Sequence, residues 1–167
     1  MDLDRIDFAI LDALQNDARL SNKELAARIN LAQSSCLERV RRLREDGALL
    51  DAHADVSDEA LGIGVQALIH VQLTRHSRDL VSEFEVYVRA IDEVVAAYHV
   101  TGEHDFMLHV VVADTEHLRD LLLDRFTTRD EVSRVQTQIL FSYHRRPARP
   151  NFRARPPKRH EEVESRG

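Results

Sequence analysis

The sequence predicts an α+β chain in which a small helical unit precedes a sheet covered by helices. Three observations predict this class. Residues 1–47 contain three short runs with apolar side chains at helical spacing. From Val65 onward, stretches in which every second residue is apolar, as in strands, are separated by two runs with helical spacing. Gly62 and Gly64 lie between these patterns and mark a boundary. The second pattern runs strand, helix, strand, strand, helix, strand, which is the ferredoxin-like βαββαβ plan.

Length and charge limit the classes of function. With 167 residues, of which 43% are hydrophobic, the chain can form one medium or two small domains. The net charge of −6 is uneven, because residues 1–50 carry −1, residues 51–143 carry −10 and residues 144–167 carry +5. Positive charge is therefore local, and the acidic middle is unsuited to contact with DNA.

The compartment is predicted from what the sequence lacks. No apolar run approaches the roughly 18 residues of a membrane span, and the acidic N-terminal stretch does not resemble a signal peptide. A soluble cytoplasmic protein without membrane contact is expected. The single Cys36 excludes an internal disulfide framework, and there is no C-x-x-C motif. Cys36 lies on the apolar side of a predicted helix, which favours a buried small hydrophobe over a redox sensor.

The first helix is predicted from the spacing of its apolar residues, and the second also from a starting signal. Helix 1 is expected from Asp4 to Gln15. Its inward side chains recur at helical spacing and are Ile6, Ile10, Leu11 and Leu14. In the second helix Ser21 is the predicted N-cap, and Glu24, three residues later, completes a capping box.

The third helix follows a sharp turn and carries most of the basic charge of this region. Its expected inward residues recur at helical spacing, with one beside them, and are Cys36, Leu37, Val40 and Leu43. Gly47 is placed to end the helix in a left-handed cap. Four arginines fall within residues 39–44, although a helix does not need them to form.

A bent helix pair with a basic second member is typical of the helix-turn-helix of DNA-binding proteins, because a helix fits the major groove and guanidinium groups suit phosphates. The alternative is a solvated helix face supported by i, i+4 charge pairs. The candidate DNA-contacting residues are Ser21, Asn22, Gln33, Ser34, Ser35, Arg39, Arg41 and Arg42. Gln33 to Ser35 are expected near base edges, and Arg39 and Arg42 at phosphate or guanine. Arg41 and Arg44 are expected to border the core.

The predicted domains follow these changes of pattern. Residues 1–50 form the winged helix-turn-helix, and residues 51–64 form a wing strand and linker. Residues 48–56 alternate loosely enough to give the wing, and residues 58–61 a short helical turn. Residues 65–144 form the ferredoxin-like domain. Residues 145–167 are basic and proline-rich and are predicted to be disordered, with added phosphate contacts as the alternative.

The strand residues predict which sheet face is covered. The expected elements are strands 65–73, 94–100, 105–112 and 135–143, and helices 79–91 and 115–126. The face expected under the helices holds Val65, Ala67, Ile69, Val71, Leu73, Phe106, Leu108, Val110 and Val112. The opposite face holds Leu68, His70, Gln72, Val95, Ala97, His99, Met107, His109, Val111, Gln138 and Leu140. This second set is too apolar for open solvent and too polar for a sealed core, so it is predicted to form a dimer interface.

Four stretches resemble the leucine-responsive, or feast/famine, regulators (Lrp/AsnC family). They are L-D-R-I-D from Leu3, I-L-D-A-L-Q from Ile10, S-N-K-E-L-A from Ser21 and C-L-E-R-V-R-R-L from Cys36. The resemblance implies a winged helix-turn-helix joined to a small αβ domain that dimerises and binds an amino acid in many members. It also implies transcription regulation on double-stranded DNA, and homodimers that assemble further, with an octamer expected. Ala32 and Gln33 stand where the family usually carries Ser and Pro.

V-T-G-E-H-D from Val100 to Asp105 is the candidate effector site. A glycine lets the backbone approach a ligand, exposed amides receive a carboxylate, and Glu103 or Asp105 suits an ammonium group. The alternative is an ordinary hairpin turn. The stretch is similar to the family's effector loop, which implies the effector-binding set Thr101, Gly102, Glu103, His104, Asp105 and Thr137. His104 replaces the usual aromatic residue, and Val135 replaces one of two threonines.

Three other functions are weighed. His70, His99 and His109 are expected on one sheet face, but without tight ligand spacing, so pH-sensitive or interface histidines are favoured over a metal sensor, and no metal or other cofactor is predicted. A regulator without an amino-acid effector stays open. An enzyme is not predicted and no catalytic residue is assigned, because no nucleophile elbow or glycine-rich phosphate loop is present and an enzyme would leave the N-terminal unit unexplained.

Overall fold

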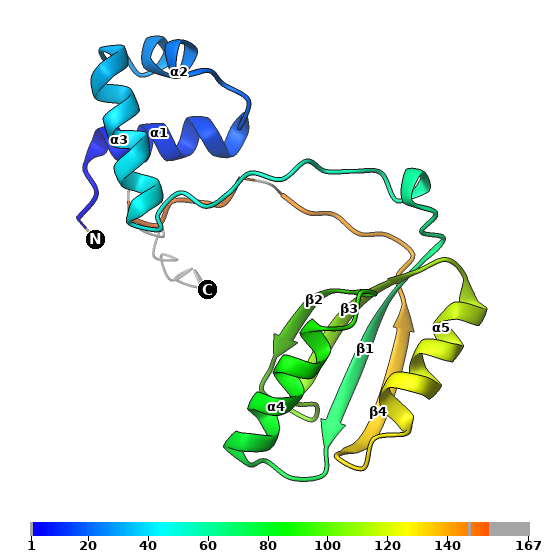
Figure 1. Cartoon of the computed structure of the whole chain (residues 1–167). Helices are drawn as coiled ribbons and strands as arrows, with labels where there is room; N and C mark the ends of the chain where they lie inside the picture. Colours follow the sequence, from blue (N-terminus) through cyan, green and yellow to red (C-terminus); the bar gives the residue numbers. More distant parts are fainter. Residues whose placement is uncertain (1, 147, 154–167) are drawn as a thin grey trace, which may run out of the picture. The chain divides into compact units, whose positions relative to one another are not determined.

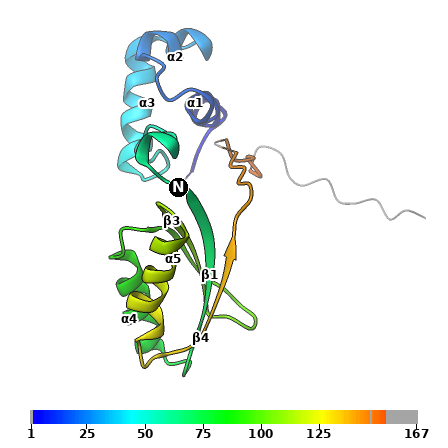
Figure 2. The same cartoon turned by 90° about the vertical axis from the view of Figure 1, so that its right-hand side faces the viewer.

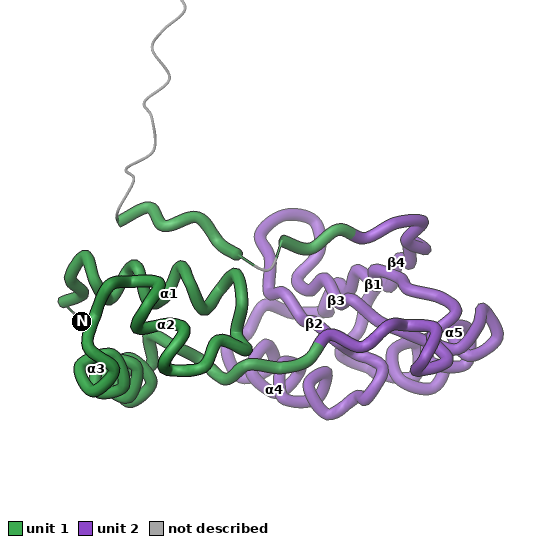
Figure 3. The backbone as a smooth tube through the Cα atoms, turned by 90° about the horizontal axis from the view of Figure 1, so that it is seen from above, with its two compact units in different colours: residues 1–54, 144–167 green, residues 55–143 purple. Residues whose placement is uncertain are grey.

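A computed structural model describes residues 2–146 and 148–153 and divides the chain into two compact units (Figures 1 and 3). Unit 1 contains residues 1–54 together with the chain from His144 onward, and unit 2 contains residues 55–143. The short turn that follows the linker therefore belongs to unit 2. Among the described helices, none has the length and apolar character needed to cross a membrane.

Unit 1 is built on three helices, and the one N-cap predicted from the sequence, that of the second helix, is present. The helices are α1 (Arg5–Asn16), α2 (Asn22–Arg28) and α3 (Gln33–Glu45). Asp4 caps α1 and forms a capping box with Asp7, and the predicted box of Ser21 and Glu24 is confirmed at the start of α2. No side chain caps α3, because Ala32 stands at its N-cap.

The core of unit 1 lies where the three helices meet, and its buried apolar residues are Ile10, Ala13, Leu25, Ala26, Cys36, Val40 and Leu43. Gly47 ends α3 as predicted, with a φ of 69° and Ala48 N–H donating to Leu43 O at 2.8 Å. The placement of Leu37 with the core was wrong. Its side chain is 59% exposed, because Leu37 follows Cys36 by one residue and so turns away from the buried stripe.

The predicted wing strand at residues 48–56 does not form. These residues adopt no strand, and the first of them bend back over α3, with the Leu49 amide donating to Leu43 O at 2.9 Å. A strand needs a neighbour that accepts its backbone hydrogen bonds, and the described part of unit 1 contains no strand. Loose alternation of apolar and polar residues was therefore not enough to predict a strand.

Unit 2 has the predicted βαββαβ order. After a 3-10 turn (η1, Glu59–Leu61), its elements are β1 (Val65–Leu73), α4 (Arg78–Arg89), β2 (Val94–His99), β3 (Phe106–Val112), α5 (Thr115–Leu122) with a π-helical extension (η2, Leu123–Thr127), and β4 (Val132–Ile139). The strands form one antiparallel sheet in the order β2-β3-β1-β4. Both helices cover the same face of the sheet, and the other face is left open (Figure 2).

The core of unit 2 confirms the covered face predicted for β1 and β3. Ala67, Ile69 and Val71 of β1 are fully buried against the two helices, as are Leu108 and Val110 of β3. The last strand begins three residues earlier than expected, at Val132, and ends at Ile139.

The face predicted for β2 was wrong for Ala97 and His99. The register between β2 and β3 shifts between Val94 and Ala96, so that Tyr98 lies opposite Met107 and His99 lies opposite Phe106. An extra residue reverses the face of every side chain after it. The open face therefore carries Ala96 and Tyr98, whereas Ala97 and His99, which were predicted there, lie opposite Leu108 and Phe106 of the covered face.

Candidate DNA-binding and effector surfaces

The first turn of α3 presents neutral polar side chains to solvent. Gln33, Ser34 and Ser35 are all exposed, as the sequence predicted. The Asn22 side-chain amide donates to Gln33 O at 2.9 Å, so the starts of α2 and α3 are held together. The Ser21 hydroxyl donates to the Glu24 carboxylate at 2.6 Å and is therefore already engaged in the capping box.

Two of the four arginines of α3 are bound by carboxylates of α1. Arg39 Nη1 donates to Asp4 Oδ2 at 2.6 Å and to Asp7 Oδ1 at 2.9 Å. Arg42 Nη2 donates to both carboxylate oxygens of Asp7, at 2.9 and 2.8 Å. Asp7 is fully buried. The amide of Asp7, and then the Arg39 guanidinium, lower the pKa of Asp4 below its usual value.

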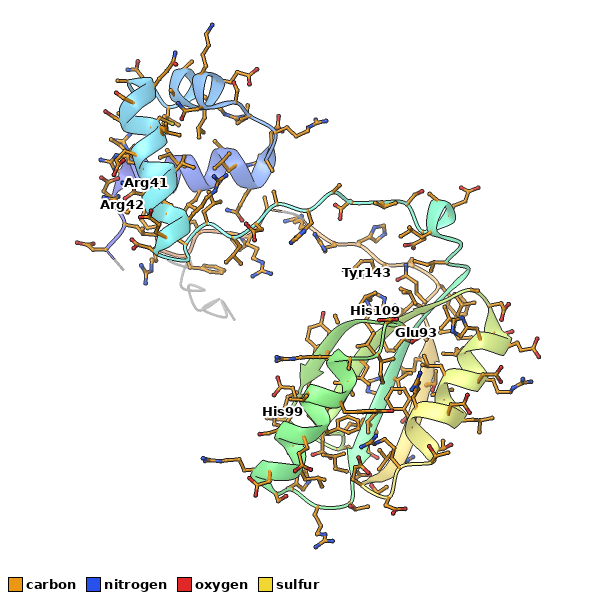
Figure 4. The ribbon with its side chains drawn as sticks, viewed as in Figure 1. Arg41, Arg42, Glu93, His99, His109 and Tyr143 are labelled. Carbon is orange, nitrogen blue, oxygen red and sulfur yellow. The ribbon has the colours of Figure 1, made fainter. Side chains whose placement is uncertain are left out.

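The other two arginines of α3 are Arg41 and Arg44, which were expected to border the core. Both side chains are exposed, and Figure 4 marks Arg41 and Arg42 on this helix. Arg41 pairs along the helix with Glu38 at 2.8 Å and with Glu45 at 3.8 Å. Pairs between exposed groups are weak and exchange readily with other partners.

The β2–β3 hairpin contains the predicted effector loop, which includes Thr101. Gly102 has a φ of 122°, a conformation that favours glycine, and the adjacent Glu103 pairs with Arg134 of β4 at 2.9 Å. Both partners are exposed. Sequence reasoning did not identify Arg134, because its partner lies 31 positions away.

Asp105 secures the base of this hairpin. It is 3% exposed, and its Oδ2 accepts the Leu73 N–H at 2.7 Å. Its Oδ1 lies 2.8 Å from His76 Nδ1. Because both oxygens are engaged within unit 2, Asp105 holds the loop on β1, and its carboxylate is not open to a ligand ammonium group.

His104 and Thr137 lie in different elements, His104 in the β2–β3 hairpin and Thr137 in β4. The His104 ring lies 5.1 Å from that of His70, and its Nδ1 is buried without a hydrogen-bond partner among the described residues. Thr137 lies opposite Ile69, on the face under the helices. The structure therefore brings His104 together with His70, and it places Thr137 away from them.

Histidines also occupy the open sheet face. His109 Nε2 lies 2.8 Å from Gln66 Oε1, and its ring lies 5.2 Å from that of Tyr143 (Figure 4). Burial lowers the pKa of His109 and outweighs the attraction of Asp58. His99 was expected beside them, but it stacks on Phe106 on the helix-covered side, with ring centroids 5.0 Å apart. No cluster of three metal-ligating side chains occurs among the residues described.

Part of the C-terminal segment lies against α1. The Arg149 N–H donates to Gln15 Oε1 at 2.8 Å, and Phe8, Leu11 and Phe152 line a hollow of about 260 Å³ beside this bond. Disorder was predicted for the whole tail. Residues 148–153 are ordered on α1, and residues 147 and 154–167 lie outside the described residues.

Comparison with known proteins decides what this two-unit arrangement is. Residues 3–49 match the model of a winged helix-turn-helix DNA-binding domain, and residues 66–148 match that of the Lrp/AsnC ligand-binding domain. The chain belongs to the Lrp/AsnC family. It is an HTH-type transcriptional regulator, as the resemblance implied, and the enzyme alternative falls because the relatives are regulators.

Curated Lrp/AsnC relatives match over most of their length. The HTH-type transcriptional regulator AldR of Mycolicibacterium smegmatis is 39% identical over 144 residues, which are 86% of this chain and 84% of the relative. The leucine-responsive regulatory protein of Escherichia coli is 33% identical over 139 residues, which are 83% of this chain and 85% of that protein.

Solved Lrp/AsnC structures share the fold. A transcriptional regulator from Neisseria meningitidis, solved as a complex with L-Met, has a TM-score of 0.78 and 32% identity, and the match covers 84% of this chain and 91% of that one. AsnC of Escherichia coli has a TM-score of 0.76 and 27% identity, over 86% of this chain and 95% of that one.

Proposed function

We propose that this Lrp/AsnC regulator reads specific DNA sequences with the start of α3 and changes its DNA binding when unit 2 binds an amino acid or a related small molecule. The observation that carries the proposal is the exposed row Gln33, Ser34 and Ser35 on the second helix of a helix-turn-helix. Neutral polar side chains there suit base edges in the major groove. Asn22 holds the starts of α2 and α3 together through its hydrogen bond to Gln33 O. In this proposal Arg41 contacts a phosphate of the DNA backbone.

The proposed effector site is the hairpin around Gly102. A ligand-binding domain model covers this region, and the Neisseria relative was solved with L-Met. The exposed pair of Glu103 and Arg134 offers opposite charges 2.9 Å apart, and an amino acid carries the two complementary charges. Thr101 and His104 flank the pair along the hairpin. Thr137 acts, on this proposal, only through the strand that also carries Arg134.

A regulator without an amino-acid effector is the second candidate. It is favoured by the engagement of Asp105 with Leu73 and His76, because this removes one predicted ammonium ligand. The histidine at position 104 points the same way, since the family usually carries an aromatic residue there. On this alternative, unit 2 assembles subunits or responds to pH and does not bind an amino acid.

Assembly links the two units in the proposal. The open sheet face joins two subunits, and dimers associate further, toward an octamer, so that several weak half-site contacts act together through effective concentration. An effector shifts this assembly only through its different affinity for the assembled and dissociated states.

Fluorescence anisotropy tests the proposal on DNA from upstream of the protein's own gene, with a scrambled duplex as control, across a salt series and with or without pooled amino acids. Preference for the upstream duplex, altered by the pool, is the expected result. A preference for the upstream duplex that the amino acids do not change supports the second candidate, a regulator without an amino-acid effector. Equal binding to both duplexes contradicts the DNA-reading role.

A further inference from the structure

The ion pairs between α1 and α3 have a consequence for DNA recognition that rests on the proposed function. Arg42 is bound by both oxygens of Asp7, and Arg39 bridges Asp7 and Asp4. Two negative charges thus face two positive ones, and the cluster is close to neutral. A neutral cluster attracts phosphates much less than two free guanidinium groups.

Burial separates this cluster from the other charge pairs of α3. The Asp7 side chain is 1% exposed, whereas Glu38 and Glu45, which pair with Arg41, are 66% and 62% exposed. An exposed carboxylate that loses its arginine to a phosphate is resolvated by water. A buried carboxylate is not, so release of Arg42 would cost Asp7 two hydrogen bonds that water cannot replace and leave its charge balanced by Arg39 alone.

We propose that Asp7, with Asp4, is a positioning residue that withholds Arg42 and Arg39 from the DNA backbone and thereby keeps non-specific binding weak. This assigns the two arginines a role different from the direct contacts expected from the sequence. Discrimination between sequences then depends on the neutral side chains at the start of α3, and Arg41 remains as an exchangeable phosphate contact. Asp7 raises the ratio of specific to non-specific affinity without touching DNA.

The test measures the salt dependence of binding to a scrambled duplex by full-length protein. Each added phosphate contact steepens the plot of log K against log salt by about 0.9. Asp7→Asn frees Arg42 while Asp4 still holds Arg39, so we expect a slope steeper by about 1 per bound helix-turn-helix. Adding Asp4→Asn, which keeps a good N-cap residue, is expected to raise the gain to about 2. Affinity for the scrambled duplex rises severalfold, and preference for the upstream duplex falls.

Two controls separate this effect from a general change of charge or of fold. Asp46→Asn makes the same charge change at the exposed C-cap of α3 and is expected to leave the slope nearly unchanged. Arg42→Gln combined with Asp7→Asn is expected to restore the wild-type slope. A merely structural role of Asp7 lowers the melting temperature but does not steepen a salt slope.

Arg42→Gln provides a second test in case Asp7→Asn does not fold. Arg42→Gln alone leaves Asp7 paired with Arg39, and the wild-type slope is expected to persist. A slope shallower by about 1 in this variant shows that Arg42 contacts phosphate in the native protein and overturns the proposal. An unchanged slope in folded Asp7→Asn overturns it as well. Loss of sequence preference by the wild-type protein is a different result, which contradicts the proposed function.

Discussion

His109 is a residue whose burial gives a pH dependence. Because the folded state lowers the pKa of His109, the unfolded chain binds its proton more tightly. The stability contribution is complete above the ordinary value of 6.5, and it falls as the pH drops from 6.5 toward the lowered value. We expect the melting temperature of unit 2 to fall more between pH 7.5 and pH 5.5 in the wild type than in His109→Gln. Equal falls in both proteins contradict this assignment.

Asp105 is a buried carboxylate with a structural role. Asp105→Ala leaves the Leu73 N–H without its acceptor inside the fold, and a loss of about 1 to 3 kcal/mol in the unfolding free energy of unit 2 is expected. His76→Ala is the matched control, because His76 is 74% exposed and its removal leaves the bond to Leu73 intact. Urea unfolding of both variants measures the difference. A larger loss in the histidine variant disproves the ranking.

Residues that act through distant partners were not identifiable from the sequence. Asp7 reads as one of several acids near an N-cap, and only the fold brings it to Arg42, 35 positions away. Charge type is visible in a sequence, but the partner of a charge is set by tertiary packing. The exposed neutral residues at the start of α3 were predicted because that prediction needs only residue type and position. The contacts of Asp105 with Leu73 and His76 were not predicted because they depend on tertiary packing.

At the scale of the element, α3 begins without a side-chain cap. Ala32 has a φ of −64° and a ψ of 141°, which is the extended conformation of an N-cap, but it offers no hydrogen-bond acceptor. Ala32→Ser is expected to stabilise unit 1 by about 1 kcal/mol, because its hydroxyl accepts an orphan amide of the first turn. Thermal unfolding measures the gain. Ala27→Ser, inside α2 and exposed, is the control and is expected to give a small loss.

Periodicity predicted the elements better than their pairing. The two-residue repeat predicted the observed bounds of β1, and the 3.6-residue repeat predicted α4 and α5 to within a few residues. The bulge in β2 was invisible, because alternation along one strand does not show where its partner gains or loses a residue. The prediction of a wing strand was wrong for a related reason. A strand forms only beside a second segment that pairs with it, and the alternation along one segment does not show whether such a partner exists.

At the scale of the whole molecule, the open sheet face predicts an assembly. Met107 and Val111 lie on this face, opposite His70 and Gln66 of β1. Lysine at both positions places charges in the proposed interface, and we expect light scattering to show a halved mass. Lysine at Val86 and Leu123, which are 70% and 50% exposed on the helical side, is the control. A dimer that survives both lysines on the open face contradicts the interface.

The packing of residues 148–153 against α1 has a consequence for folding during synthesis. Gln15 is synthesised before its partner Arg149, which is 134 positions further along the chain. At a synthesis rate of about 5 to 20 residues per second, this partner arrives roughly 7 to 27 s later. The outer side of the nascent α1 is therefore uncovered during that interval, and it acquires its packing against residues 148–153 only after they have been synthesised.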